Sequence, residues 1–225
     1  SLKNSVTPDD MYAAFGADTL RLYEMSMAPI TQDRPWETRS VVGSQRLLQR
    51  VWRTIIDEQT GELAVSDDAP SEELLRVLHK TIDGVTADMD NLRYNTAIAK
   101  LTELNNEVTR AEGPTPRVVA DAMVRMLSPL VPHMAEELWS KLGGAGSVVW
   151  AEFPAADASF LIDDQAELPV QVKGKVRGRV RVAPDADEST ALAAATADEN
   201  VVAHIAGAEI RKVIYVPGRM INIIV

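Results

Sequence analysis

The 225-residue sequence contains no cysteine, only three histidines and no apolar run of the roughly 18 residues that a membrane helix needs. The absence of cysteine excludes disulfides and thiolate metal sites and favours a reducing compartment, so a cytoplasmic location is expected. His79, His133 and His204 lie far apart in the chain, which argues against a histidine metal site. Neither a metal nor a membrane partner is therefore predicted.

Signatures of catalysis are missing as well. The sequence has no P-loop, GxGxxG, HExxH or GxSxG pattern. Its 33 Asp and Glu residues fall mostly on the polar faces of expected helices, where a solvated surface is the ordinary interpretation. In "PLVPHMAEELW" we interpret His133 as a packed or capping residue near a helix start, and Trp139 as a core or interface anchor. No catalytic residue is predicted.

The first 150 residues have helical periodicity. Thr7 and Pro8 form a helix start, and Gly16 is expected to end that helix. From about Glu37 to Glu58, apolar residues recur at spacings of three, four and seven, and Ser71 begins a further helix with the same pattern. Four or five amphipathic helices with short connections predict an antiparallel bundle.

The period changes to two in the last third of the chain. After an expected linker, residues 170–182 read "VQVKGKVRGRVRV", with Val or Gly at every even position and polar residues at odd ones, which predicts a half-buried hairpin. Two helical segments and two β-rich runs follow, so the order β-β-α-α-β-β predicts a small α+β domain. The chain is therefore expected to be mainly α, with a helical bundle followed by this α+β domain.

Side-chain parity predicts the loop of that hairpin. A three-residue loop at residues 173–175 places Val172 opposite Val176 and Val170 opposite Gly178, which keeps valines on one face and cations on the other. A two-residue loop would place Val172 opposite Lys175 and mix the faces. We therefore expect the three-residue loop.

Positive charge is concentrated in this hairpin. The whole chain has a formal net charge of −10, yet residues 170–182 contain five Lys and Arg and no acid. An edge strand often carries lysine to prevent aggregation, but adjacent like charges repel and so suggest a polyanion partner. Arg46, Arg50 and Arg53 share one helix face, which is either a solvated edge or a track for phosphates.

Several longer segments resemble a known family. "SLKNSVTPDDMYAAFGADTLRLYEMSMAP" resembles the segment after the KMSKS signature of class I aminoacyl-tRNA synthetases. "NLRYNTAIAKLTELNNEV" and "PLVPHMAEELW" resemble the helical anticodon-binding domain of the leucine, isoleucine and valine enzymes. "VQVKGKVRGRVRV" with "IRKVIYVPGRMINIIV" resembles the C-terminal domain of bacterial leucyl-tRNA synthetases. The resemblance covers essentially the whole chain.

The resemblance implies a C-terminal fragment with four parts: connecting helices (1–36), an anticodon-binding bundle (37–150), a linker (151–166) and an α+β tRNA-binding domain (167–225). The nucleotide-binding fold, the editing domain and the KMSKS lysines would precede Ser1, which matches the last serine of that signature. The fragment would then hold no cofactor, whereas the parent enzyme uses ATP and Mg²⁺. It would bind leucine tRNA as a monomer beside the upstream catalytic domain and be inactive alone.

The residues that match the family's tRNA-binding surface lie mostly in the tail. They are Lys173, Lys175, Arg177, Arg179, Arg181, Arg211, Lys212 and Arg219, with Arg46, Arg50 and Arg53 on the bundle. Gly178 departs from relatives, which often have a side chain there. Two alternatives stay open: the isoleucine or valine specificity, and an acidic helical scaffold that binds proteins through an exposed apolar patch.

Overall fold

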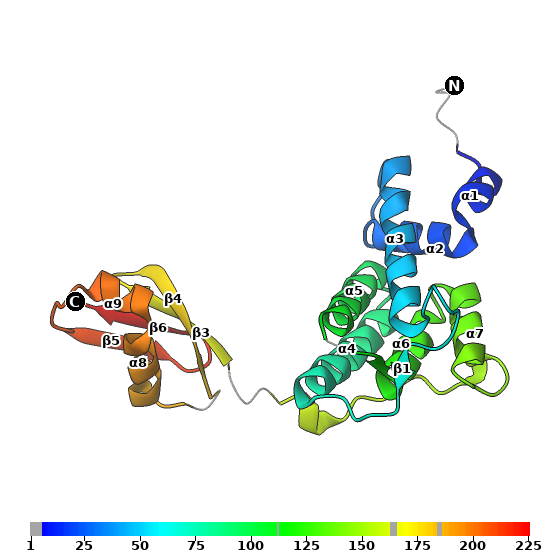
Figure 1. Ribbon diagram of the computed structural model, residues 1–225. Helices are drawn as coiled ribbons and strands as arrows, with labels where there is room; N and C mark the ends of the chain where they lie inside the picture. The colour runs from blue at the N-terminus through cyan, green and yellow to red at the C-terminus, as the bar shows by residue number, and fades with distance from the viewer. Residues whose placement is uncertain (1–5, 112, 163–165, 184–185) are drawn as a thin grey trace. The chain divides into compact units, whose positions relative to one another are not determined.

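The computed structural model describes residues 6–111, 113–162, 166–183 and 186–225. The chain divides after Leu161 into two compact units, which are considered separately (Figure 1). The first is helical, and the second is a small sheet with two helices. This agrees with the predicted mainly α fold followed by an α+β domain. Ser1 and residues 163–165 of the expected linker lie outside the described residues.

Helices dominate the first unit. They are α1 (Pro8–Phe15), α2 (Ala17–Ser26), α3 (Thr38–Ile55), α4 (Glu72–Asp90), α5 (Tyr94–Arg110), α6 (Arg117–Leu127) and α7 (Pro132–Lys141). Two short strands, β1 (Val65–Ser66) and β2 (Thr115–Pro116), pair in parallel, and the 3-10 turns η1 (Val148–Trp150) and η2 (Ala158–Phe160) follow. The predicted caps are confirmed, because Thr7 Oγ1 accepts from Asp10 N–H at 3.3 Å and Ser71 Oγ from Leu74 N–H at 3.2 Å.

The apolar stripes predicted from periodicity form the core of this unit. On α3, Val41, Leu48, Val51 and Ile55 are buried, and the main core continues over α4 to α7. A smaller cluster joins α1 and α2 to the start of α3, where the rings of Tyr23 and Trp36 meet edge to face. Burial of one helix face leaves the opposite face of α3 at the surface.

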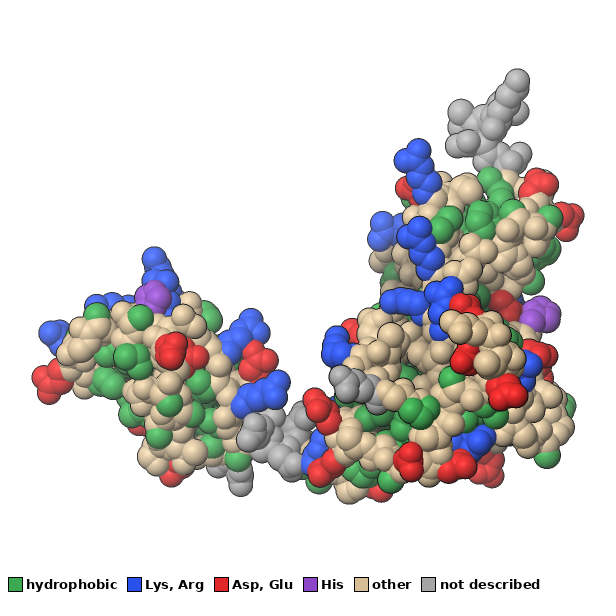
Figure 2. All heavy atoms as spheres, in the orientation of Figure 1, with side chains coloured by type: hydrophobic (Ala, Val, Ile, Leu, Met, Phe, Trp, Pro, Cys, Tyr) green, Lys and Arg blue, Asp and Glu red, His purple; other side chains and the backbone are tan. Residues whose placement is uncertain are grey.

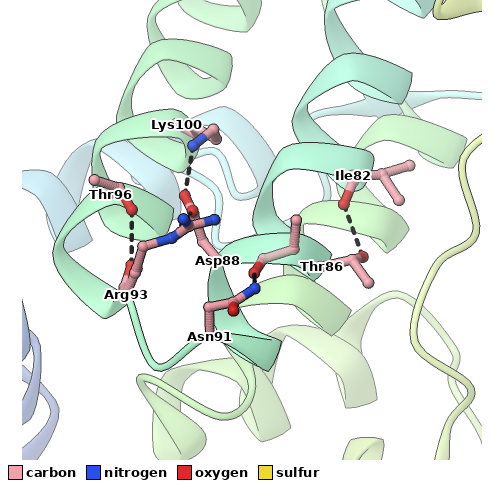
Figure 3. Close-up of polar contacts among 8 residues, drawn as sticks. Ile82, Thr86, Asp88, Asn91, Arg93, Thr96 and Lys100 are labelled. Carbon is pink, nitrogen blue, oxygen red and sulfur yellow. Dashed lines mark hydrogen bonds and ion pairs between the residues drawn. The ribbon is translucent and has the colours of Figure 1, made fainter.

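A buried carboxylate closes the turn between α4 and α5 (Figure 3). The Asp88 side chain is 4% exposed and accepts from Arg93 Nε at 2.9 Å and from Lys100 Nζ at 2.5 Å. Leu92 takes a positive φ of 57°, and Arg93 N–H donates to the Asp88 carbonyl. The "NLRYN" segment therefore reverses the chain, and its arginine neutralises Asp88 in the last turn of α4.

Part of the expected linker packs on the first unit. The imidazole of His79 on α4 stacks on the Phe160 ring with centroids 4.8 Å apart, and Asp157 N–H donates to His79 Nδ1 at 3.1 Å. Residues 151–161 thus belong to the first unit, because an aromatic contact and a backbone hydrogen bond hold them against α4.

The second unit has the predicted element order. Its elements are β3 (Ala166–Val172), β4 (Lys175–Val182), α8 (Glu188–Ala197), α9 (Glu199–Ile205), β5 (Lys212–Val216) and β6 (Met220–Ile224). The strands lie in the order β4-β3-β6-β5, with β3 and β6 parallel. Ala191, Ala195 and Val201 of the two helices pack on one sheet face, and the other, the open face, has no helix over it among the described residues.

The predicted hairpin loop is wrong. Val172 pairs with Lys175, so the loop has two residues, Lys173 and Gly174, with φ of 53° and 77°. Two successive positive φ values are typical of a type I′ turn, which matches the twist of the strands. A β-bulge then restores the expected parity, because Arg177 is an extra residue between the pairs Gln171–Val176 and Val170–Gly178.

Candidate nucleic-acid interface

The arginines of the hairpin lie on an edge strand of the sheet. Because β4 is at the edge and Val180 and Val182 are buried, Arg179 and Arg181 alternate onto the open face and are exposed. Arg177 is half-buried at the bulge. The separation of valines from cations is thus confirmed for this part of the hairpin, although the loop that was expected to produce it is different.

Val176 is a correction to the predicted core. The sequence places it on the buried face, but it is 54% exposed because it precedes the bulge and pairs with Gln171. Ile214 on β5 is 41% exposed on the same open face as Val176, because it pairs with Asn222, which in turn pairs with Gln171. The open face therefore combines aliphatic side chains with the arginines of β4, a pairing that sequence parity did not reveal.

The tail cations form two groups at opposite ends of the sheet. Lys173 N–H donates to the Ile223 carbonyl and Arg211 N–H to the Ile224 carbonyl, so the β3–β4 turn and the start of β5 share one end. This end carries Lys173, Lys175, Arg211 and Lys212. Arg219 lies in the β5–β6 turn at the other end, towards which Arg181 also lies. The structure therefore does not bring all eight predicted residues together.

Little of this charge is neutralised within the described residues. Arg179 Nη1 lies 3.0 Å from Glu167 Oε1, and no other ion pair involves the eight tail cations in the part of the chain that the structure describes. The side chain of Asn222 also fixes the turn, because its Oδ1 accepts from Gly174 N–H at 3.2 Å. A fixed turn with unneutralised cations is suited to phosphate oxygens.

The first unit presents a second basic surface on α3. Arg46, Arg50 and Arg53 are exposed on one face of the helix, as their spacing predicts, and Figure 2 shows Lys and Arg side chains along the part of the unit that α3 occupies. Arg39, which is not among the predicted residues, lies on the same face seven residues before Arg46. The spacing alone could have identified it.

Two of these arginines have partners. Arg50 Nη1 donates to Asn106 Oδ1 at 3.1 Å, and Arg53 Nε lies 2.8 Å from Glu58 Oε2. Within the described residues Arg39 and Arg46 have no ion-pair partner. A cleft of about 370 Å³ lies beside Arg50 and Arg53. Threonines, the 113–115 segment and the apolar residues Ala64, Val108 and Ala111 line it, so the C-terminal end of the basic face is hollow, with a lining that is partly polar and partly apolar.

A clasp joins α2 to the corner between α6 and α7. Asp18 accepts from Met134 N–H at 2.7 Å and lies 2.9 Å from His133 Nδ1, so the carboxylate caps the start of α7. Arg21 donates to the carbonyls of Pro129 and Leu130, at the end of α6. His133 is 75% exposed, which shows that Asp18 rather than the histidine supplies the cap.

The remaining candidates have structural roles. Trp139 is half-buried against the main core, as an anchor should be, and its indole lies on Gly144. Among the described residues no group of three or more His, Asp and Glu is placed to hold a metal ion, and no helix is long and apolar enough to cross a membrane. The candidate site that remains is the set of exposed cations on α3 and in the second unit.

Comparison with known proteins finds a matching family and several similar proteins. The family model of the anticodon-binding domain of tRNA ligase matches residues 71–192, which is more than half of the chain. Leucine–tRNA ligases of Streptomyces avermitilis and Saccharopolyspora erythraea are 55% and 57% identical to it over its whole length, and that of Mycobacterium avium is 55% identical. The chain spans 23–24% of the length of these relatives.

A solved structure is similar along nearly all of the chain. It is the crystal structure of the ternary complex of Agrobacterium radiobacter K84 agnB2 LeuRS with tRNA and LeuAMS, with a TM-score of 0.75 and 26% identity. The similarity covers 99% of this chain and 31% of that one.

Proposed function

Because the chain belongs to the family of anticodon-binding domains of tRNA ligases, we propose that it is the tRNA-binding part of a leucine–tRNA ligase. In this function it binds leucine tRNA as a monomer and orients the acceptor end for ATP-dependent aminoacylation by an upstream catalytic domain. ATP and Mg²⁺ belong to that domain. Binding energy from contacts remote from the chemistry is what such a part contributes.

The observation that carries the proposal is the pattern of cations in the tail. A net charge of −10 disfavours nonspecific coating of nucleic acid, so binding has to depend on local surfaces. The open face of the sheet and the turn at Lys173 and Gly174 provide one such surface. The arginine face of α3 provides another. Both surfaces expose Lys and Arg side chains, which are suited to contacts with phosphates.

We propose further that the helices of the first unit form the antiparallel bundle of the class I enzymes. The turn between α4 and α5 supports this arrangement, because the two helices that it connects pack against each other. The open face of the sheet would then contact the corner of the tRNA, while α3 follows its body. Both contacts are made by the same chain, so binding of one surface raises the effective concentration of the other at the same tRNA.

The test is the salt dependence of affinity for leucine tRNA. The variant Lys175→Ala/Arg177→Ala/Arg179→Ala should bind more weakly, and the slope of log affinity against log salt should fall by about 0.7–0.9 for each lost phosphate contact. Arg179 already has an acidic partner, so the loss of two contacts, a fall in slope of about 1.4–1.8, is expected. Isoleucine and valine tRNAs should compete poorly with leucine tRNA.

A matched control removes the same charge elsewhere. Arg76, Arg110 and Lys141 each form an ion pair within their own helix on the first unit. Their triple alanine variant should keep both the affinity and the slope. If the hairpin variant behaves like this control, the hairpin does not bind tRNA. If the unaltered chain binds no RNA in a salt-dependent way, the proposed function fails altogether.

A further inference from the structure

Gly43 occupies an unusual place in α3. It lies inside an 18-residue helix, it is exposed, and it is not among the residues with positive φ. A Cβ built on it would meet nothing within 4 Å. Alanine would fit the backbone and the space and would form a more stable helix. Nothing inside the described chain therefore requires glycine at this position.

Gly84 of α4 is a glycine that a neighbouring side chain of the same protein requires. A Cβ at Gly84 would lie 2.6 Å from Cε and 2.8 Å from Cδ of Lys100, the lysine that reaches Asp88. That glycine makes room for a side chain of the same protein. None of the described residues fills the space above Gly43 in this way, which points to a partner outside the chain.

The surroundings of Gly43 define the chemistry of that partner. Arg39 and Arg46 lie one turn before and one turn after it, and Arg50 follows on the same face. Neither Arg39 nor Arg46 has an ion-pair partner in the described parts of the chain. Between Arg39 and Arg50 the helix rises by about 17 Å. A row of cations of this length matches several successive phosphates of an extended polyanion.

We propose that the face of α3 formed by Arg39, Gly43, Arg46 and Arg50 receives one strand of RNA backbone, with Gly43 at the point of closest approach. The missing side chain lets the sugar-phosphate chain come down to the helix surface, where arginines on either side reach its phosphates. The inference rests on the proposed function, and the RNA is then the bound tRNA. Gly43 is a positioning residue, since it sets the distance at which the arginines act.

Two variants of Gly43 test the inference, and in the alanine variant thermal stability and tRNA affinity should change in opposite directions. Gly43→Ala should raise the midpoint of thermal unfolding of the first unit by about 2–4 °C. The same variant should weaken tRNA binding about tenfold, because the methyl group displaces the backbone from a charge-assisted contact. Gly43→Leu should weaken it further. A more stable protein that binds less tightly cannot be explained by damage to the fold.

The control is Ala87→Leu, which adds bulk at an exposed position on α4. It should leave tRNA affinity unchanged. If Gly43→Ala and Gly43→Leu bind tRNA as tightly as the unaltered chain does, the inference is overturned, and Gly43 faces something other than RNA. That result differs from failure of the proposed function, in which the unaltered chain shows no salt-dependent tRNA binding at all. Should Gly43→Leu not fold, the alanine variant decides the matter.

Discussion

Replacement of Asp88 by asparagine or alanine should destabilise the first unit, because this carboxylate is buried between two cations (Figure 3). Removing one partner of a fully buried ion pair costs about 3–5 kcal/mol. Here Arg93 and Lys100 are 54% and 37% exposed, so water can solvate them once the acid is gone. We therefore expect a loss of about 2 kcal/mol for Asp88→Ala, and somewhat less for Asp88→Asn.

The pH dependence gives the sign of the effect. Burial raises the pKa of the Asp88 carboxyl, but the hydrogen bond from Lys100 and the charges of Lys100 and Arg93 lower it more, so the pKa lies below the ordinary value of 3.8. The unfolded chain therefore binds this proton more readily than the folded chain does. The stabilisation is fully present above about pH 4 and is lost as the pH falls through the lower folded pKa.

Urea unfolding followed by tryptophan fluorescence provides the assay, because all four tryptophans precede the division after Leu161. The difference between the unaltered chain and Asp88→Asn should be largest at pH 7 and should shrink below pH 4. Asp90→Asn, an exposed substitution on the same helix, should have little effect. Equal stability of Asp88→Asn and the unaltered chain at pH 7, or a difference that does not change down to pH 3, would refute the reasoning.

Two further glycine substitutions are predicted from the space around them. Gly84→Ala should fail to give the gain of up to about 1 kcal/mol that helix propensity suggests, because its methyl group displaces Lys100 from Asp88; urea unfolding should show that gain only in the Asp88→Ala background. Gly178→Ala should destabilise the second unit by about 1–3 kcal/mol, because its Cβ would lie 2.7 Å from Val201 Cγ2. Hydrogen exchange of β4 amides checks this, and unchanged protection would contradict it.

Helix positions and the order of elements in the tail could be predicted because they depend on local patterns. Thr7 and Ser71 cap their helices as expected, and the buried residues of α3 follow the predicted stripe. The clasp made by Asp18 and Arg21 could not be predicted in the same way. Their partners lie more than 100 residues away in the sequence, and no local pattern specifies such a contact.

The hairpin shows where parity reasoning fails. Its premise, that valines face inward and cations outward, is correct for Val180 and Val182. The inference from that premise to a three-residue loop is wrong, because a bulge at Arg177 changes the phase as effectively as a longer loop does. Strict alternation in the sequence cannot distinguish the two solutions. The pairing of Val172 with Lys175 and the exposure of Val176 show which solution the chain adopts.

Gly43, Gly84 and Gly178 differ in what surrounds them, and this difference bears on the two basic surfaces. Gly178 lets the start of α9 pack closely on β4, so the strand that carries the tail arginines is held from its inner side. Gly84 admits Lys100 to an internal ion pair. In both places a neighbour within the chain fills the space that a side chain would need. At Gly43 no described residue lies within 4 Å of the place where a Cβ would be, and Arg39 and Arg46 lie one turn away on either side, which is why we propose that RNA approaches the helix there.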